Sequence, residues 1–351
     1  MTTIGVGILG TGLAFQAIHA RMLAELAPRF AVRCVWDPDP ARTADAAGWL
    51  GARAAQTADD LLDDPAVDVV VIASPARFHA AQALAAISAG KKAVLVEKPL
   101  CATPDEADAI ARAAQASGTA LLVGAMHSHD PAWLAAQDVL ANRAFTPALV
   151  RSSIILPPNA RFEEWSTEPL PPVASPAGDG VAAGGAGVMT PAQMMRLSIL
   201  ELAIHDMPLV RRLLPEGQEP RVLAARLRQP FGYAVSVQVG DVVVDLSGLV
   251  HGHWQTDWTL EAVGPQGRLS LDFTPSFVMA GSGAMAWRSP DGVCAHASSG
   301  QNGYIGQWLA LAAMLDGTHP LPDPWAAAAD FRFAHAIAEQ AAALIDGGTA
   351  E

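Results

Sequence analysis

The stretch MTTIGVGILGTG, residues 1–12, decides the fold, because an apolar segment runs directly into a turn that contains two glycines. Gly10-Thr11-Gly12 ends a predicted strand and is followed by a helix-competent segment that starts with Leu13 and Ala14. In doubly wound sheets such glycines let backbone N–H groups approach a pyrophosphate, and the helix N-terminus adds partial positive charge. The stretch therefore predicts a dinucleotide-binding site.

The first third of the chain alternates short apolar runs with helical patterns. We expect strands at 4–9, 31–36, 67–73, 92–96 and 120–124, and helices near 13–27, 40–50, 78–89 and 104–117. Strands that are nearly continuous in Val, Ile and Leu are typical of a parallel sheet covered on both faces. This part of the chain is therefore predicted to be an α/β domain.

After about residue 145 the pattern changes to closely spaced strands with turn signals between them. Strands are expected at 146–156, 221–228, 233–239, 242–250, 254–263 and 267–273, and helices at 191–214, 301–316 and 324–346. Residues 157–190 are rich in Pro and Gly and are predicted to cover a substrate or to contact a subunit. We expect an N-terminal Rossmann parallel sheet in residues 1–125 and a C-terminal α+β domain in residues 126–351. The second domain should carry a large, open, mainly antiparallel sheet, with the closing helices free to pack back on the first domain.

The composition of the 351 residues narrows the class of protein. Apolar residues make up 51% of the chain and charged residues 16%, and 22 basic against 35 acidic residues give a formal charge of −13. This acidity disfavours a nucleic-acid surface, and no apolar run is long enough to cross a membrane. The widely spaced Cys34, Cys101 and Cys294 indicate neither a disulfide framework nor a metal site. Because no basic residue precedes Arg21, the start of the chain lacks the charged segment of a secretory signal, and we expect a cytoplasmic protein.

Asp37 ends the second predicted strand, 25 positions after Gly12. A carboxylate there can accept hydrogen bonds from the adenosine ribose hydroxyls and repel a 2′-phosphate, which favours NAD over NADP. The alternative is a solvated aspartate in the loop Asp37-Pro38-Asp39-Pro40.

Glu97 and Lys98 directly follow the strand predicted at 92–96. The carboxyl ends of strands in such sheets face the ligand crevice, where the nicotinamide is expected. A lysine at this place can hydrogen-bond a substrate hydroxyl and stabilise the alkoxide that develops while hydride leaves. The alternative is a solvated lysine with no part in chemistry.

Several motifs together resemble the glucose–fructose oxidoreductase / inositol dehydrogenase / rhizopine catabolism protein family. They are Gly10-Thr11-Gly12, Asp37-Pro38-Asp39-Pro40, Ser74-Pro75 with His79, Gly90-Lys91-Lys92 and, above all, Glu97-Lys98-Pro99. The segment from Trp254 to Phe273, with Gly264 and Gly267, is similar to the sheet domain of that family, and Tyr304 begins a helix in a similar place. The resemblance covers nearly the whole chain.

This resemblance implies a Rossmann domain, an open antiparallel-sheet domain, bound NAD(P), and hydride transfer on sugars or cyclitols. It identifies Lys98 as the catalytic lysine of the family. The third glycine position falls on Phe15, so the first helix is expected to lie slightly further from the strand. The expected cofactor contacts are Gly10, Thr11, Gly12, Leu13, Ala14, Asp37, Arg42, Ser74, Pro75, His79, Glu97 and Lys98.

Glu201 and His205 are four positions apart within the helix predicted at 191–214, which would place them on one helix face. Histidine is a natural proton acceptor for an alcohol near neutral pH, and a carboxylate beside it would hold and polarise the ring. The alternative is a surface pair that contributes about 0.2–0.5 kcal/mol. In the family this segment typically reads Asp-x-x-x-His, so the resemblance supports His205, while Glu201 replaces the usual aspartate. The catalytic candidates are Lys98, His205 and Glu201.

A polar cluster, Met126-His127-Ser128-His129-Asp130, follows the strand predicted at 120–124. Many family members carry polar residues near this place that hold polyol hydroxyls, so His127 is a candidate substrate contact. A metal site is disfavoured, because His127 and His129 would point to opposite sides of an extended strand. The expected substrate contacts are Lys98, His127, Trp165 and His205, and no metal is expected.

These observations predict an NAD-dependent dehydrogenase, with NADP less favoured, that acts on a secondary hydroxyl of a sugar, cyclitol or related polyol. His205 would take the hydroxyl proton, and Lys98 would stabilise the oxygen. Two alternatives stay open: an NAD-retaining glycosidase that acts by transient oxidation and elimination, and a non-catalytic protein that senses cofactor or sugar. The open sheet favours a homodimer or homotetramer, and no nucleic-acid or membrane partner is expected.

Overall fold

The computed structural model describes residues 2–158, 160, 189–252 and 255–347. The chain forms two compact units. Of the described residues, unit 1 comprises 2–124 and 307–331, and unit 2 comprises 125–158, 160, 189–252, 255–306 and 332–347. Helices α10 (Gly303–Leu315) and α11 (Pro324–Asp346) contribute residues to both units. Within the described ranges no helix combines the length and the apolar character that a membrane span requires.

Unit 1 contains a six-stranded sheet in the order β3-β2-β1-β4-β5-β6, and every pair of neighbours is parallel. Its strands are β1 (Ile4–Leu9), β2 (Phe30–Trp36), β3 (Arg53–Ala54), β4 (Val69–Ile72), β5 (Ala93–Val96) and β6 (Ala120–Val123). From β1 the chain adds β2 and β3 on one side and then returns to add β4, β5 and β6 on the other side, so the strand order reverses between β1 and β4. A ligand crevice is expected at the carboxyl ends of these strands. The predicted doubly wound sheet is confirmed.

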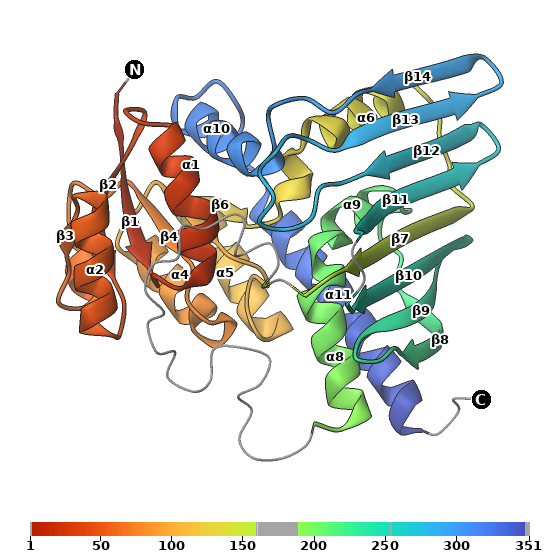
Figure 1. Cartoon of the computed structure of the whole chain (residues 1–351), viewed down its shortest axis with the longest axis horizontal. Coiled ribbons are helices and arrows are strands. Elements are labelled where there is room, and N and C mark those ends of the chain that lie inside the picture. The colour runs from red at the N-terminus through yellow and green to blue at the C-terminus, as the bar shows by residue number, and fades with distance from the viewer. Residues whose placement is uncertain (1, 159, 161–188, 253–254, 348–351) are drawn as a thin grey trace. The chain divides into compact units, whose positions relative to one another are not determined.

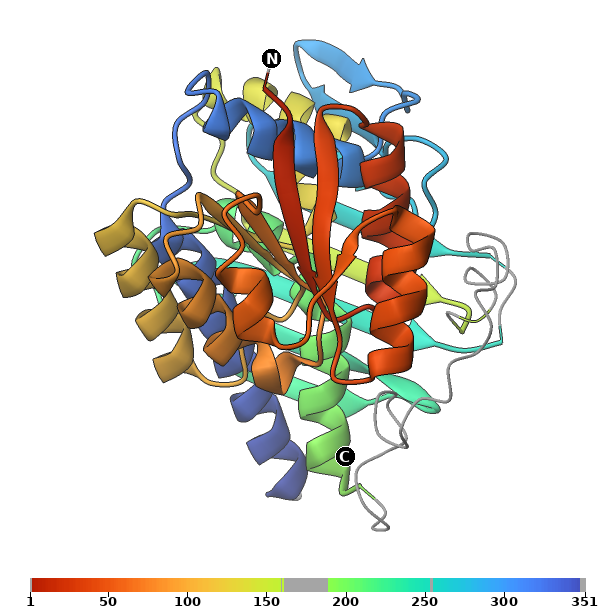
Figure 2. The ribbon, with the colours of Figure 1, turned by 90° about the vertical axis from the view of Figure 1, so that its left-hand side faces the viewer.

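Helices flank both faces of this sheet (Figures 1 and 2). They are the π-helical turn η1 (Phe15–His19), α1 (Ala20–Glu25), α2 (Pro40–Leu50), α3 (Ala58–Leu62), the 3-10 turn η2 (Ala76–Phe78), α4 (His79–Ser88) and α5 (Pro104–Ser117). The predicted bounds of α2 and α5 are confirmed to the residue. Asp39 caps α2, and Thr103 with Glu106 forms a capping box at the start of α5, so polar side chains satisfy the first free N–H groups of both helices.

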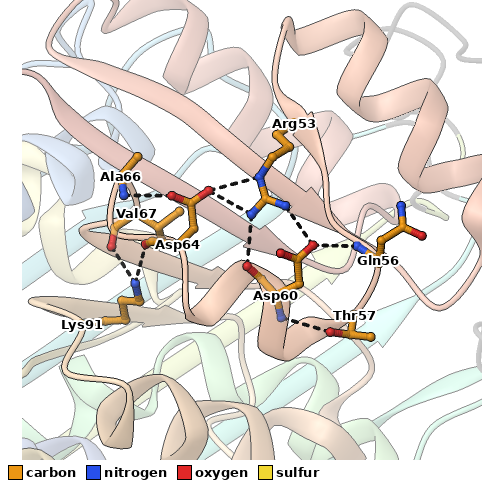
Figure 3. Close-up of polar contacts among 8 residues, drawn as sticks. All are labelled: Arg53, Gln56, Thr57, Asp60, Asp64, Ala66, Val67 and Lys91. Carbon is orange, nitrogen blue, oxygen red and sulfur yellow. Dashed lines mark hydrogen bonds and ion pairs between the residues drawn. The ribbon is translucent and has the colours of Figure 1, made fainter.

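The short strand β3 and helix α3 are held by a polar cluster around Arg53 (Figure 3). The Arg53 guanidinium donates to Asp60 at 2.8 Å and to Asp64 at 2.9 Å. The nearby Lys91 ammonium donates to the backbone carbonyls of Asp64 and Val67, at 2.9 and 3.0 Å. Burial lowers the pKa of Lys91, partly offset by the neighbouring aspartates. These contacts explain an ordered segment that has little apolar pattern of its own.

Unit 2 contains an eight-stranded sheet in the order β14-β13-β12-β11-β7-β10-β9-β8. All neighbours are antiparallel except β7 and β10, which are parallel. The strands are β7 (Leu149–Leu156), β8 (Arg221–Leu227), β9 (Phe231–Val239), β10 (Val242–Val250), β11 (Asp257–Gly264), β12 (Gly267–Asp272), β13 (Ala284–Ser289) and β14 (Gly292–His296). The predicted open, mainly antiparallel sheet is confirmed, and β13 and β14 extend it beyond the strands that were expected.

The helices of unit 2 lie along one face of this sheet (Figure 1). They are η3 (Met126–His129), α6 (Pro131–Ala141), α8 (Pro191–Glu201), η4 (Ala203–His205) and α9 (Met207–Arg212), together with the end of α11. Side chains of β10 alternate between buried and half-buried along most of the strand, as in a sheet with one packed and one open face. Among the described candidate residues, His127 lies in η3, Glu201 ends α8 and His205 lies in η4, all of them elements on the packed face.

The prediction of one continuous helix over 191–214 is wrong. Helix α8 ends at Glu201, a 3-10 turn follows at Ala203–His205, and α9 starts at Met207. Pro208 accounts for the break, because proline lacks an N–H group and its ring clashes with the carbonyl four residues earlier in a helix. Glu201 and His205 therefore do not share the face of one α-helix, and the geometric premise of that predicted pair is corrected.

Candidate active site

The glycine turn of unit 1 has the shape that a pyrophosphate requires. Gly10 has a φ of 90°, and a Cβ atom at this position would lie 2.6 Å from the backbone nitrogen of Ser74. Gly12 is different, since a Cβ atom there would project into open space. Gly10 thus lets the turns after β1 and β4 approach each other, while Gly12 leaves the start of the first helix accessible to a ligand.

The Asp37 carboxylate lies at the end of β2 and is fixed against this turn. Its Oδ2 atom accepts hydrogen bonds from the Thr11 backbone N–H at 2.9 Å and from the Thr11 hydroxyl at 3.1 Å. Its Oδ1 atom accepts from the backbone N–H of Asp39 at 3.0 Å. Arg42 follows in α2, with its Nε atom 4.0 Å from the Asp39 carboxylate and a side chain that is 11% exposed. The Asp37 carboxylate is thus held in a fixed position at the place where the adenosine ribose is predicted to bind.

The segment Glu97-Lys98-Pro99 follows β5 and is held by two buried histidines of unit 1. His19 Nε2 lies 2.7 Å from Glu97 Oε1, and the two side chains are 3% and 13% exposed. His79 Nδ1 lies 2.7 Å from the Pro99 carbonyl oxygen, and His79 Nε2 lies 2.7 Å from that of Ser74. Both ring nitrogens of His79 therefore face backbone groups, and direct contact of His79 with a cofactor stays a prediction.

Glu97 is a buried carboxylate that its surroundings keep ionised. Burial alone would raise its pKa, but the hydrogen bond from His19 and the charges of His19, Lys98 and His79 outweigh burial and lower it. Gly124 packs directly against this carboxylate, since a Cβ atom there would lie 2.8 Å from Glu97 Oε1. The residue before Lys98 is thus fixed on several sides.

Lys98 differs in position from the other two lysines of the chain, Lys91 and Lys92. Those two precede β5, where Lys91 binds backbone carbonyls and the exposed Lys92 pairs with Asp68 at 2.8 Å. Lys98 follows β5 at the carboxyl edge of the sheet and is half-buried. Of the three lysines, Lys98 is therefore the one at the edge of the sheet where a doubly wound fold binds its ligand.

In unit 2 a buried carboxylate that the sequence analysis did not single out lies beside the candidate residue His127. Asp206 is fully buried and accepts hydrogen bonds from the Ser152 hydroxyl at 2.7 Å and the Trp258 indole N–H at 2.9 Å. His127 Nδ1 lies 3.5 Å from the same carboxylate. Asp206 thus connects β7, β11 and η3.

Two histidine rings pack on Trp258 beside this carboxylate. His127 meets Trp258 edge-on at a centroid distance of 4.5 Å and stacks on Phe273 at 4.1 Å. His205 meets Trp258 edge-on at 5.4 Å and is 9% exposed.

Residues 126–129 form a 3-10 turn rather than the extended strand that was assumed for His127 and His129. Burial and the charge of Arg212 lower the pKa of His129 to about 4.

The structure places the remaining predicted site residues as follows. Pro75 caps the turn η2, and the Ser74 hydroxyl donates to Gln82 at 2.6 Å. Leu13 is an exposed apolar side chain and Ala14 caps η1, both directly after the glycine turn. Trp165 lies outside the described residues, as do most of residues 157–190.

Sequence reasoning missed His19, Asp206 and Tyr233. Tyr233 lies on β9 opposite Gly248, its ring is fully buried, and its hydroxyl has no hydrogen-bond partner among the described residues. Burial and the charge of Asp206 raise its pKa well above the usual value. One sequence signal indicates Asp206, its position next to His205, but a continuous helix would favour Glu201 as the carboxylate beside that histidine.

Comparisons with known proteins agree with this arrangement. Residues 4–125 match the family described as "Oxidoreductase family, NAD-binding Rossmann fold". Inositol 2-dehydrogenase 1 of Saccharopolyspora erythraea is 30% identical over 299 residues, which cover 84% of this chain and 80% of that protein. Inositol 2-dehydrogenase 2 of the same organism is 32% identical over 281 residues, covering 77% and 73% of the two chains.

Two solved structures have the same fold. UDP-N-acetylglucosamine 3-dehydrogenase from Acidithiobacillus ferrooxidans is 20% identical with a TM-score of 0.73, and the match covers 98% of this chain and 100% of that chain. A 3-ketoreductase from Actinomadura kijaniata, in complex with NADP and TDP-benzene, is 20% identical with a TM-score of 0.71 and coverages of 96% and 97%. Taken with the sequence relatives, these matches show that the chain belongs to the glucose–fructose oxidoreductase / inositol dehydrogenase / rhizopine catabolism protein family and carries an NAD(P)-binding Rossmann domain in unit 1.

Proposed function

We propose that the protein is an NAD(P)-dependent dehydrogenase that acts on a secondary hydroxyl, or the corresponding ketone, of a sugar, cyclitol or related polyol. The observation that carries the proposal is Lys98 at the carboxyl end of β5, directly after a buried and ionised Glu97. The similarity to inositol 2-dehydrogenases over most of the chain supports the same substrate class.

The glycine turn fits a dinucleotide, because Gly12 leaves open space at the start of the first helix. When bound, the nicotinamide supplies the chemistry by accepting a hydride from the substrate carbon or returning one to it. The residues that would hold the dinucleotide are the turn Gly10-Thr11-Gly12, Leu13, Ala14, Asp37, Arg42, Ser74, Pro75, His79, Glu97 and Lys98.

Lys98 binds the reacting oxygen and stabilises the negative charge that develops on it, since an ammonium is a strong hydrogen-bond donor to an alkoxide. His205 takes the hydroxyl proton during oxidation and returns it during reduction. His127 and Trp165 contact further hydroxyls of the substrate. Glu201 stays a proposed partner of His205, although the two do not share the face of one helix.

We further propose a preference for NAD over NADP, which rests on the fixed carboxylate of Asp37. The wild-type protein should bind NAD about 10-fold or more tightly than NADP, because the ionised carboxylate repels a 2′-phosphate. Asp37→Asn should reduce this ratio to within about threefold. Isothermal titration with both nucleotides measures the ratio.

Asp39→Asn is the matched control for this prediction, because it removes one charge from the same loop at the exposed cap of α2. It should leave the ratio of the two affinities unchanged. An equal change in both variants would mean that the general charge of the loop, and not Asp37, sets the preference.

A second prediction concerns the two glycines of the turn. Gly10→Ala should lower the free energy of unfolding by about 2 kcal/mol or more, since Ala disfavours a positive φ and its Cβ atom would meet Ser74. Gly12→Ala should unfold like the wild type but bind NAD at least about 10-fold more weakly, because its Cβ atom occupies the approach of the pyrophosphate. Urea unfolding and nucleotide titration separate the two effects. Tight NAD binding by Gly12→Ala would argue against a dinucleotide at this turn.

The experiment that tests the function is a panel assay. Purified protein is mixed with NAD or NADP and a series of cyclitols, sugars and sugar derivatives, and reduced nicotinamide is followed by absorbance. Turnover of at least one polyol is the expected result. Release of sugar from an aryl glycoside without net cofactor reduction would indicate the glycosidase alternative, and tight cofactor binding without turnover would indicate a sensing protein.

We also propose a homodimer or homotetramer built through the face of the unit 2 sheet that no described helix covers. Half-buried Leu149 and Ile155 lie on this face together with the exposed Arg151. The three cysteines are free, two of them buried, which accords with the proposed cytoplasmic location.

A further inference from the structure

The two histidines that flank Lys98 are unequal in chemistry. His79 binds backbone carbonyls on both sides of its ring and ties Pro99 to Ser74. His19 instead binds a carboxylate, Glu97 Oε1, and its second ring nitrogen, Nδ1, is buried with no hydrogen-bond partner among the described residues. His19 is therefore the member of this pair that hydrogen-bonds a charged side chain.

A π-helical turn brings His19 to this position. The N–H group of Ala20 donates to the carbonyl of Phe15, five residues earlier, whereas the N–H group of Gln16 donates to Gly12, four residues earlier. A π turn adds one residue to the helix and rotates all later side chains by about 100° relative to an uninterrupted α-helix. Such turns are rare in proteins overall, and those that occur often lie at functional sites.

The hydrogen bond from His19 matters for the charge of Glu97, because the carboxylate has little contact with solvent. The carboxylate is mostly buried, Gly124 packs against it, and its Oε2 atom faces the backbone N–H of Lys98 at 3.3 Å. The titratable groups that act on it are His19 from η1, His79 from α4 and the adjacent Lys98. Without the donor at His19, the pKa of Glu97 would rise, because burial favours the neutral acid.

We propose that His19 is a positioning residue: through its hydrogen bond to Glu97 it keeps a negative charge beside Lys98 and fixes the segment that carries the lysine. The inference rests on the proposed function for the role of Lys98. The contact between His19 and Glu97 lies within unit 1 and does not depend on that function.

The test uses His19→Phe, which removes the donor, His19→Gln, whose amide can still donate, and Trp308→Phe as the matched control. Trp308 packs edge-on against the His19 ring at a centroid distance of 5.9 Å without a hydrogen bond to Glu97. Since the chain has three lysines, protein labelled with [13Cε]lysine gives three side-chain signals, and the Lys98→Met variant assigns the signal of Lys98. His19→Phe should shift the Lys98 signal and leave those of Lys91 and Lys92 in place.

On a substrate found by the panel assay, His19→Phe should lower kcat by about 10- to 100-fold with the NAD dissociation constant within about threefold. Removing the donor raises the pKa of Glu97, so the acid limb of the kcat profile should move to higher pH. His19→Gln should restore most of the lost kcat and return the acid limb toward its wild-type position, and Trp308→Phe should change neither.

The outcomes separate this inference from the proposed function. Absence of polyol turnover in the wild type would remove the proposed function, while the lysine spectra would still decide whether His19 acts on Lys98. An unmoved Lys98 signal in a folded His19→Phe variant would overturn the inference. So would equal shifts in His19→Phe and Trp308→Phe, because they would show a packing role alone.

Discussion

Lys98→Met lowers kcat by about 1,000-fold and leaves the dissociation constant of NAD within about threefold. Methionine keeps the length and the apolar stem of the side chain but removes the charge and the hydrogen-bond donors. Stabilisation of a developing alkoxide by one such donor contributes about 100- to 1,000-fold, and assisted proton transfer adds to it. Steady-state kinetics on the substrate found by the panel assay, together with nucleotide titration, measures both quantities.

Lys92→Met is the matched control for this result. Lys92 is six positions earlier on the same strand segment, is exposed and pairs with Asp68 at the opposite end of β5. Its replacement removes the same functional group from the same unit and should leave kcat within about twofold, as surface substitutions usually do. A Lys98→Met variant with the turnover of the wild type would remove Lys98 from the mechanism.

Asp206→Ala lowers the free energy of unfolding by about 3 kcal/mol. The side chain is fully buried, and its removal leaves the Ser152 hydroxyl and the Trp258 indole N–H without their acceptor. Each buried donor left unpaired costs about 1–3 kcal/mol. Urea unfolding followed by circular dichroism measures the change.

The chain offers a close comparison on the opposite side of the same strands. The Ser153 hydroxyl donates to Asp257 at 2.9 Å, so a serine on β7 is paired with an aspartate there as well, but Asp257 is exposed. Asp257→Ala should therefore cost no more than about 0.5 kcal/mol. Equal costs for the two variants would mean that Asp206 does not organise the interior of unit 2.

Much of unit 1 was predictable because its signals are local. The strands β1, β4, β5 and β6 are unbroken apolar runs, and β2 is interrupted only by Arg33. The ends of α2 and α5 are set by Asp39, Thr103 and Glu106 within a few residues of the helix. The glycine turn and Lys98 follow from the same patterns, since the strand ends define where ligand-facing residues lie.

The features that escaped prediction depend on partners far away in sequence. His19 contacts Glu97 across 78 positions. The π turn at Phe15–His19 adds one residue to the helix, and the apolar periodicity of the sequence does not reveal that extra residue. Asp206 finds Ser152 and Trp258 across 54 and 52 positions. The segment at β3 and α3 is held by Arg53 and its aspartates rather than by apolar periodicity.

The central claim is that this chain moves a hydride directly between a polyol carbon and a bound nicotinamide. The measurement that tests it most directly uses the polyol that is turned over in the panel assay, deuterated at the reacting carbon, together with NAD. The account predicts one deuterium in the reduced nicotinamide for each ketone formed, with none exchanged into water. Deuterium that appears in solvent, or that stays in a product formed without reduced cofactor, would contradict it.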